Sequence, residues 1–538
     1  MMKNKLYLSF LIVICFSLWI ILSSHITHPF IFPDENIYTQ MSRSFWYDGN
    51  FSFRGKGQDI PSILYPVITS PVWILDNPQH RILVYRVINS LCILFSAIPV
   101  YWILALVVPQ KRRLATLAAI LVLPGWMYAG THMAENIYYP LFLCVIASIF
   151  SYLVDRTHIV LIVIFALLSF YAKPHILLLT PGYLLTAGIL FVHKDTRIAQ
   201  KLLKATMALF AGPVTYILWH GIFHNTGMWK TWFIGSQYNT IIRGMVPFSF
   251  VDFSIAIVCL GFLCCMPLLF FPGRSYRLTN SVSSLFRLMT ICTCVSLVFL
   301  IAYFTVTHGE VNRVHERYLF PIIPLIIISV TATNVSSHKR WLYFLFIIIM
   351  VIIGTTLISS RADWPISTDS PTLVAFFTCK LRYNLFPGFV IAGFILISSV
   401  TAVLLSRNFT FSTWCMPCSF LVLTLLSFYG YKTIDSFQEQ KGGAFRKWIA
   451  ENIPPTTYVA YVIDGYGELL RQRCYMSEMY ANHDTRVITT KTEFDQTGEG
   501  ALVMMNGLHF EQKPAAHFED SSLYFISFSQ GAVLNPDQ

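Results

Sequence analysis

The stretch FPDENIYTQMSRSFWYDGNFSF, residues 32–53, determines how the rest of the sequence is interpreted. It places Asp34 and Glu35 side by side, just after an apolar segment that is long enough to cross a membrane. Two carboxylates just outside the hydrocarbon are costly to dehydrate unless they meet water, a cation or a substrate. These two residues are therefore the first candidates for chemistry.

The residues after the acidic pair have the pattern of a helix that lies along the bilayer surface. Pro33 suits the first turn of such a helix, and Gly49 ends it. The apolar side chains fall on one stripe, which consists of Ile37, Met41 and Phe45. The sequence therefore predicts the acidic pair at a helix N-terminus at the membrane edge. The plainer alternative, in which Asp34 only caps this helix, stays open.

Composition indicates a polytopic membrane protein. Of 538 residues, 55% are hydrophobic and 12% are charged, and the mean hydropathy is +0.58. This is about half the charge content of soluble domains. The net charge of +11 indicates basic cytoplasmic loops that face anionic lipid, and no nucleic-acid partner is expected.

The cysteines predict neither a disulfide framework nor a metal site. Most of the twelve lie inside apolar segments, where cysteine behaves as a small hydrophobic residue. Cys415 and Cys418 form a C-x-x-C, but no second pair stands at zinc-ligand spacing. The first apolar segment has no small-x-small cleavage site before His25, so we interpret it as an uncleaved span.

Apolar runs predict a mainly α fold with about thirteen membrane spans. The fifth and tenth are short. The runs are Leu6–Ser23, Val87–Val108, Leu114–Tyr128, Tyr138–Val154, Ile159–Tyr171, Ile176–Val192, Ala205–Trp219, Phe253–Phe271, Leu288–Thr307, Leu319–Val330, Trp341–Ser359, Pro387–Ser406 and Ser419–Tyr431.

Charge bias gives the expected orientation. The loops between spans alternate in character, and those on one side of the membrane are short and basic, as at Lys111–Arg113, Lys194–Lys204 and Lys339–Arg340. Because short basic loops face the cytoplasm, this alternation predicts a cytoplasmic N-terminus. Residues 1–431 then form a membrane module, and residues 432–538 form a small extracytoplasmic α/β domain. In that domain we expect strands at 458–463, 502–505 and 523–528. The expected location is the plasma (inner) membrane.

With this orientation, polar residues gather on the outer face. The first outer loop holds the acidic pair and Lys56, the second reads THMAENIYYP, the third AKPH, and a later one THGEVNRVHERYLFPIIP. Acids and bases at one level of the membrane would form a site that removes a proton and holds a phosphate. Each residue also has a plain alternative: Glu135 caps a helix, Lys173 snorkels, and Arg317 pairs with Glu316 or with lipid phosphate.

Three motifs resemble the GT-C superfamily of membrane glycosyltransferases. They are the Asp34-Glu35 pair after the first span, E-N-x-x-Y-P from Glu135, and R-Y-L-x-P-x-x-P from Arg317. The pattern is most similar to the branch that contains the protein O-mannosyltransferases and the lipid A aminoarabinose transferase. The resemblance covers the span layout and these motifs, but not residues 432–538.

The resemblance implies an enzyme that takes a sugar, hexose or pentose, from a polyprenyl-phosphate carrier. It assigns acid/base catalysis to Asp34 with Glu35 as its neighbour, a second acidic role to Glu135, and a donor-phosphate contact to Arg317. Lys56, Lys173 and Arg313 are further phosphate candidates by position and charge alone. The candidate acceptor or sugar contacts are His132, His175 and Tyr318.

Several points stay open at the level of sequence. The acceptor is a glycan, a lipid or a protein, as in O-antigen or lipopolysaccharide modification of a cell envelope. No cofactor is certain, and a divalent cation stays open because members of the superfamily differ. The absence of a Gly-rich nucleotide loop agrees with a lipid-linked donor. The alternative functions are a transporter or flippase and a polymerase or ligase of lipid-linked saccharides.

Overall fold

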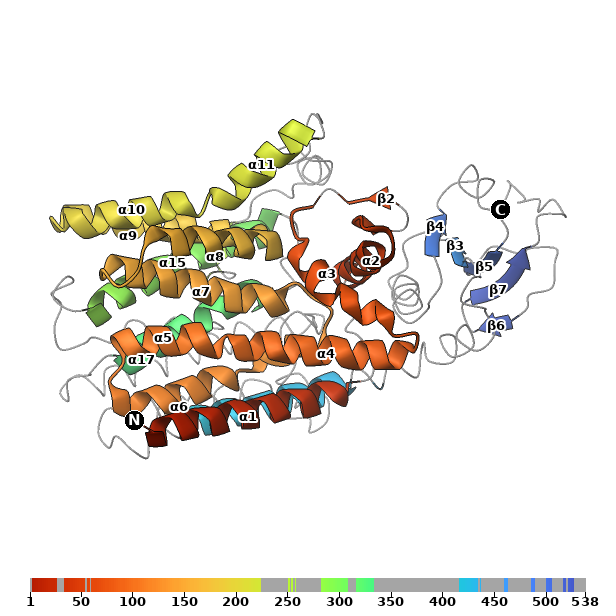
Figure 1. The fold of residues 1–538 in the computed structure, drawn as a ribbon, viewed down its shortest axis with the longest axis horizontal. Coiled ribbons are helices and arrows are strands. Elements are labelled where there is room, and N and C mark those ends of the chain that lie inside the picture. Colours follow the sequence, from red (N-terminus) through yellow and green to blue (C-terminus); the bar gives the residue numbers. More distant parts are fainter. Residues whose placement is uncertain are drawn as a thin grey trace. The chain divides into compact units, whose positions relative to one another are not determined.

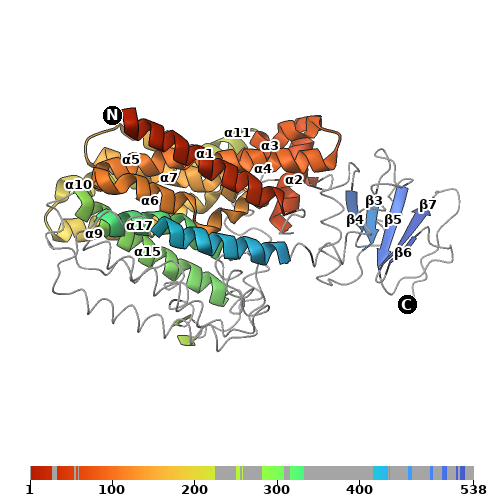
Figure 2. The same ribbon diagram turned by 90° about the horizontal axis from the view of Figure 1, so that it is seen from below.

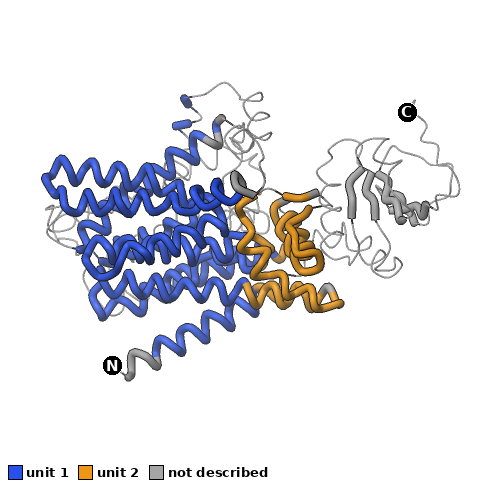
Figure 3. The backbone as a smooth tube through the Cα atoms, turned by 45° about the horizontal axis from the view of Figure 1, so that its top comes forward, with its two compact units in different colours: residues 1–22, 89–129, 134–431 blue, residues 23–88, 130–133, 432–538 orange. Residues whose placement is uncertain are grey.

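The computed structural model describes most of the N-terminal half of the chain and selected elements beyond it. The described residues are 2–26, 33–53, 56–58, 60–223, 250, 251, 253, 254, 257, 282–307, 316–332, 416–433, 436, 459–462, 485–488, 500–505, 516–518 and 521–526. The chain divides into two compact units, coloured in Figure 3. The first contains residues 1–22, 89–129 and 134–431, and the second contains residues 23–88, 130–133 and 432–538.

The first unit is a bundle of helices (Figure 1). Its described elements are α1 (Met2–Ser24), the end of α4 (Pro78–Phe95), α5 (Ala97–Val107), α6 (Gln110–Leu121), η2 (Pro124–Gly130), α7 (Glu135–Leu153), α8 (Ile159–Ala172), η3 (Pro174–Leu178), α9 (Leu179–Val192), α10 (Thr196–Ala208), α11 (Ala211–Phe223), α15 (Val282–Thr307), α16 (Glu316–Leu319), η5 (Phe320–Ile322) and α17 (Ile323–Ala332). A further helix covers residues 416–433 and is cyan in Figure 2.

Helix α7 is the centre of this bundle. It packs against α5, α8 and α10, and every residue in it except Tyr152 is buried. A helix that is apolar on all sides needs neighbours on all sides, and α7 has the sequence of such a helix beyond its first turn. Its polar first turn, which begins at Glu135, is therefore carried into the interior of the protein.

The predicted third span is bent rather than continuous. Helix α6 and η2 meet at an angle of 49°, where Pro124 follows the last helical turn. Three consecutive carbonyls at the break accept hydrogen bonds from side chains. Ile120 O accepts from Trp126 Nε1 at 2.6 Å, Leu121 O accepts from Trp19 Nε1 at 2.9 Å, and Val122 O accepts from Thr424 Oγ1 at 2.5 Å. Carbonyls freed inside apolar surroundings need such partners, so these side chains stabilise the break.

Six helices among the described residues are long and apolar enough to cross a membrane, or seven if α6 and η2 form one span. They are 7–24, 79–107, 135–153, 174–192, 196–219 and 282–303, which overlap the predicted first, second, fourth, sixth, seventh and ninth spans. The fifth and tenth correspond to shorter apolar helices. The eleventh and twelfth, and most of the eighth, lie outside the described residues. The total of about thirteen therefore stays a prediction.

The second span begins earlier than predicted, at Gln79 instead of Val87. The added residues, 79–86, include two arginines, Arg81 and Arg86. In the structure the guanidinium of Arg81 lies over the Trp73 ring at 4.4 Å and donates to Asp76 O at 3.2 Å. These contacts compensate for the dehydration of the charge, so the helix continues through it.

In the second unit, α2 (Pro33–Asp48) has the predicted bounds. Gly49 ends it with φ +66°, a left-handed conformation that favours glycine. The predicted apolar stripe is only partly correct, since Met41 is buried but Ile37 and Phe45 are half-buried. The rest of the buried face is largely polar and includes Glu35, Asn36, Thr39, Ser42 and Ser44.

A hydrogen-bond hub at Ser42 explains this polar face. Its Oγ accepts from Trp73 Nε1 at 3.2 Å and from Tyr85 Oη at 3.1 Å. Because the hydroxyl hydrogen of Thr69 goes to Tyr65 O at 2.8 Å, Ser42 in turn donates to Thr69 Oγ1, which lies 3.2 Å away. These three partners belong to α3 (Leu64–Thr69), η1 (Ser70–Ile74) and the first half of α4. Helix α2 is thus held by polar contacts as well as by apolar burial.

The C-terminal residues contain a five-stranded sheet with the order β4-β3-β5-β7-β6. Strands β4 (Thr485–Ile488), β3 (Val459–Val462) and β5 (Gly500–Met505) are parallel neighbours. Strand β7 (Ser521–Ile526) is antiparallel to β5, and β6 (Ala516–Phe518) is antiparallel to β7. Strands β3, β5 and β7 overlap the three predicted strands. The helices of the predicted α/β domain fall outside the described residues. A separate two-stranded ribbon pairs β1 (Ser52–Phe53) with β2 (Lys56–Gly57).

Candidate active site

A buried ion pair lies at the N-terminus of α7. Lys173 Nζ donates to Glu135 Oε1, and the two residues are 6% and 1% exposed. The carboxylate occupies the first turn of the helix, where the helix dipole favours negative charge. Desolvated charges of this kind are maintained only when they are paired, so each partner holds the other in place.

The local sequence fixes the position of Lys173. Pro174 disfavours helical geometry in the residue before it, and Lys173 is extended, with φ −162° and ψ 125°. Helix α8 therefore ends at Ala172, and η3 begins directly after the lysine. The main-chain N–H of Lys173 still donates to Ser169 O at 2.8 Å, which ties the junction to α8.

Tyr318 is the centre of a second group in the same unit. Arg317 Nη2 donates to the Tyr318 hydroxyl at 3.1 Å, and His175 stacks on the Tyr318 ring with centroids 5.1 Å apart. Lys173 Nζ lies 5.7 Å from the centroid of the same ring. One aromatic ring thus contacts a guanidinium, an imidazole and an ammonium group.

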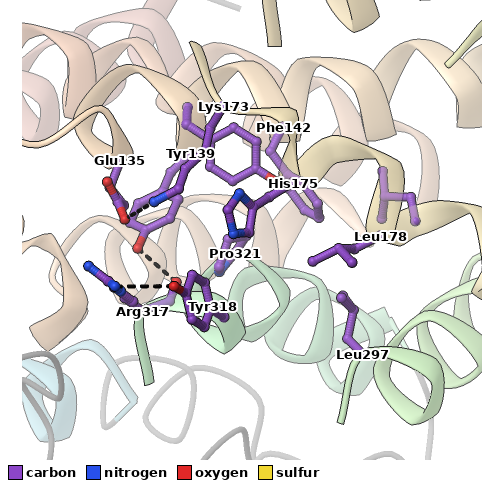
Figure 4. Close-up of a pocket in the computed structure, with 12 residues that line it drawn as sticks. Glu135, Tyr139, Phe142, Lys173, His175, Leu178, Leu297, Arg317, Tyr318 and Pro321 are labelled. Carbon is purple, nitrogen blue, oxygen red and sulfur yellow. Dashed lines mark hydrogen bonds and ion pairs between the residues drawn. The ribbon is translucent and has the colours of Figure 1, made fainter. Parts of the chain in front are cut away.

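These groups line one pocket, shown in Figure 4. It encloses about 360 Å³ of empty space, counting the part that opens to solvent, and its remaining walls are aromatic and aliphatic. Glu135 Oε2 and His175 Nδ1 are buried and have no hydrogen-bond partner among the described residues. The pocket therefore combines two cations with unused polar atoms in apolar surroundings, an arrangement suited to an anionic ligand that carries an apolar portion.

The acidic pair of α2 is described within the second unit, where its two members have different surroundings. Glu35 is fully buried, and its Oε1 accepts a hydrogen bond from the main-chain N–H of His132 at 2.8 Å. Asp34 is half-buried in the same first turn of α2. The partly exposed carboxyl can meet a ligand, whereas the buried one supports a neighbouring loop.

His132 is buried beside this pair. Its ring stacks on Tyr85 with centroids 4.3 Å apart, and its Nδ1 lies 3.2 Å from Thr39 Oγ1. The single hydroxyl hydrogen of Thr39 is donated to Glu35 O at 2.7 Å, so Nδ1–H donates to Thr39. Burial, followed by the charge of Arg86, lowers the pKa of His132 to about 3. The imidazole is therefore neutral at physiological pH.

The ten predicted site residues fall into three groups. Glu135, Lys173, His175, Arg317 and Tyr318 line the pocket together, whereas Asp34, Glu35 and His132 gather around α2. Arg313 lies outside the described residues, as does the Lys56 side chain, although its main chain forms β2. Within the described part of the chain, no group of three or more His, Cys, Asp or Glu side chains is arranged to hold a metal ion.

Sequence reasoning missed three residues in these groups. Tyr139 lines the pocket and donates its hydroxyl to Arg317 O at 2.9 Å. Thr39 and Tyr85 contact the His132 ring. A signal existed only for Tyr139, which is the tyrosine of the E-N-x-x-Y-P motif. Tyr85 lies in an apolar run, where nothing in the sequence distinguishes it from a core residue.

Comparison with known proteins identifies the fold. No family model matches the chain, and no curated protein sequence matches it. The crystal structure of ArnT from Cupriavidus metallidurans bound to undecaprenyl phosphate is similar with a TM-score of 0.60 and 14% identity, over 97% of both chains. Its apo structure gives a TM-score of 0.60 and 14% identity, over 97% of this chain and 98% of the other. The oligosaccharyltransferase AglB from Archaeoglobus fulgidus is less similar, with a TM-score of 0.46 and 10% identity, over 94% of this chain and 70% of the other.

The chain is thus a helical membrane protein with the GT-C fold, which confirms the resemblance found in its motifs. ArnT, the lipid A aminoarabinose transferase, is a solved protein that has a similar fold across almost the whole length of both chains.

Proposed function

We propose that this protein is a glycosyltransferase that takes a sugar from a polyprenyl-phosphate donor and passes it to an acceptor on the outer face of the membrane. The observation that carries the proposal is the pocket in which Lys173, Glu135 and Arg317 meet. These residues come from three distant parts of the sequence. The likeness to ArnT, whose structure holds undecaprenyl phosphate, supports the same class of ligand for this protein.

Lys173 and Arg317 are the proposed phosphate ligands. Glycosyl transfer breaks the bond between the anomeric carbon and the phosphate oxygen, so negative charge grows on the departing lipid phosphate. Fixed cations in apolar surroundings stabilise this charge more than they stabilise the donor, and such differential binding accelerates the reaction. Glu135 keeps Lys173 in place, and its buried Oε2 is available to a hydroxyl of the sugar.

Asp34 is the proposed general base. The acceptor hydroxyl forms a new bond to the anomeric carbon and loses its proton, which a carboxylate accepts. Of the two adjacent acids, Asp34 is the better candidate because it is half-buried, whereas Glu35 is fully buried and accepts the His132 N–H. Glu35 would then position the base through α2 rather than contact substrate.

The sugar, hexose or pentose, and the acceptor, a glycan, lipid or protein, are not specified by these residues. We propose that residues 432–538 take part in acceptor choice, since the expected topology puts them on the same outer face as the first loop. Deletion of this segment would then abolish transfer while binding of undecaprenyl phosphate to the folded remainder is kept. Loss of both would instead indicate a structural role.

The test uses membranes that supply both unknown substrates. The gene is deleted in the source organism, and the envelope component that loses a sugar is found by mass spectrometry. The purified protein is then added to a detergent extract of the deletion-strain membranes. We expect the sugar to be restored by the wild-type protein and not by Asp34→Asn. A flippase would fail here because a detergent extract has no bilayer to cross, so failure with folded wild-type protein would contradict a transferase.

A further inference from the structure

Tyr139 connects two walls of the pocket. It lies on α7 one turn after Glu135, and its hydroxyl donates to the main-chain oxygen of Arg317 at 2.9 Å, across 178 residues of sequence. The two residues on α7 therefore contact the two cations of the pocket by different means. Glu135 pairs with the side chain of Lys173, and Tyr139 holds the main chain of Arg317.

The segment that carries Arg317 is also held at its other end. Three residues later, the Phe320 ring packs against Trp126 with centroids 4.9 Å apart and against Tyr139 with centroids 5.1 Å apart. Gly125 leaves room for this ring, because a Cβ there would lie 2.0 Å from it. Such aromatic packing is worth more than its area alone. Residues 317–320 are thus fixed on α7 and η2 at two points.

The guanidinium depends on this anchorage. Arg317 Nη2 donates to the hydroxyl of Tyr318, the next residue, and the guanidinium carbon lies 5.0 Å from the centroid of the Tyr318 ring. Both contacts are made within the same short helix, α16, and the Tyr318 ring in turn stacks on His175, so they orient the guanidinium relative to this segment and to the wall that contains His175. The hydroxyl of Tyr139 supplies a contact to α7 that they lack.

We propose that Tyr139 is a positioning residue: its hydroxyl sets the main chain of Arg317 so that the guanidinium meets the phosphate of the carrier lipid. This inference rests on the proposed function of the pocket. Its consequence is that loss of one hydroxyl changes phosphate affinity only through Arg317.

The experiment measures binding of undecaprenyl phosphate to the purified full-length protein in detergent. Tyr139→Phe keeps the ring and removes only the donor, and we expect an affinity about tenfold lower, the size of one good hydrogen bond. Tyr183→Phe is the matched control. It removes a buried hydroxyl that has no partner among the described residues and does not line the pocket, so we expect unchanged affinity.

A double-mutant cycle separates positioning from direct contact. In an Arg317→Met background, Tyr139→Phe should cause no further loss, whereas an equal loss in both backgrounds would overturn the inference. Phe320→Leu provides a second route, with the same expected dependence on Arg317. Full affinity in Tyr139→Phe, beside a clear loss in Arg317→Met, would refute the role of Tyr139 and leave the proposed function intact. Full affinity in both Arg317→Met and Lys173→Met would instead refute the proposed function.

Discussion

The carboxylate of Glu35 and the main-chain N–H of His132 are joined by a buried hydrogen bond of 2.8 Å, although 97 positions separate them in the sequence. One member of the acidic pair is thereby committed to holding the loop that contains His132. Its neighbour Asp34, in the same helical turn, is half-buried. The pair thus divides into a buried structural acid and a more exposed acid, which is the proposed base, and this division is testable.

Glu35→Ala should destabilise the protein without any substrate present. The change removes the acceptor of a buried N–H, and an unsatisfied buried donor costs about 1–3 kcal/mol. Thermal unfolding in detergent measures the effect. Glu35→Gln keeps a carbonyl acceptor, so its melting temperature should stay closer to that of the wild type. Equal melting temperatures for Glu35→Ala and the wild type would contradict the structural role.

Asp34→Asn should show the opposite behaviour. We expect transfer to fall by about 10²–10⁴-fold, the usual contribution of a general base, while the melting temperature falls less than in Glu35→Ala. The assay is the restoration of sugar in the deletion-strain extract. A folded variant with normal transfer would remove Asp34 from the mechanism.

The Glu135–Lys173 pair predicts a strongly non-additive response to substitution. Lys173→Met leaves a carboxylate buried and unpaired, which should cost about 3–5 kcal/mol of stability. Adding Glu135→Gln removes that charge and should recover most of the lost melting temperature. Binding of undecaprenyl phosphate should not recover, because the cation is still missing. Recovery of both would show that Lys173 serves only to neutralise Glu135.

Because His132 is buried and neutral, we expect the stability of the fold to decrease at low pH. Its pKa is about 3 in the folded protein and near 6.5 when unfolded, so between these values the unfolded chain binds the extra proton. Stability is therefore full above pH 6.5 and falls as the pH drops, by up to about 1.4 kcal/mol per unit. His132→Gln should lose stability less steeply between pH 6.5 and 4.5. Parallel curves for the two proteins would contradict a buried neutral imidazole.

Close packing of α9 on α15 can be tested at two glycines of the same helix. A Cβ at Gly182 would lie 2.6 Å from Thr293 Cα, so Gly182→Ala must separate the helices and should cost about 1–3 kcal/mol. Gly188 has nothing within 4 Å of an added Cβ. Gly188→Ala should therefore be neutral or stabilising, by up to about 1 kcal/mol. The melting temperatures of the two variants, each compared with that of the wild type, measure these effects.

Local signals predicted the bounds of α2 well. Pro33 and Gly49 act through their own backbone geometry, so the extent of α2 was readable from the sequence. The face that α2 buries could not be read from the sequence, because the groups that donate to Ser42 come from residues as distant as Tyr85. A periodicity argument assigns polar residues to solvent, and it cannot foresee such a hub.

The break between α6 and η2 shows the same limit. Pro124 can be recognised in the sequence. The side chains that stabilise the buried carbonyls at the break include Trp19 and Thr424, which are remote from Pro124 in the sequence. At the site, charge and motifs identified the five polar residues that line the pocket. They did not reveal that Tyr139 holds Arg317, because that contact ends on a main-chain oxygen and leaves no pattern in the sequence.

We have proposed that the pocket of Lys173 and Arg317 holds the phosphate of a polyprenyl carrier. The most direct measurement is a density map of the full-length protein with undecaprenyl phosphate bound. We expect the phosphate within hydrogen-bond distance of Lys173 Nζ and the Arg317 guanidinium, with the lipid chain leaving along the apolar wall. A phosphate that contacts neither side chain would contradict this proposal.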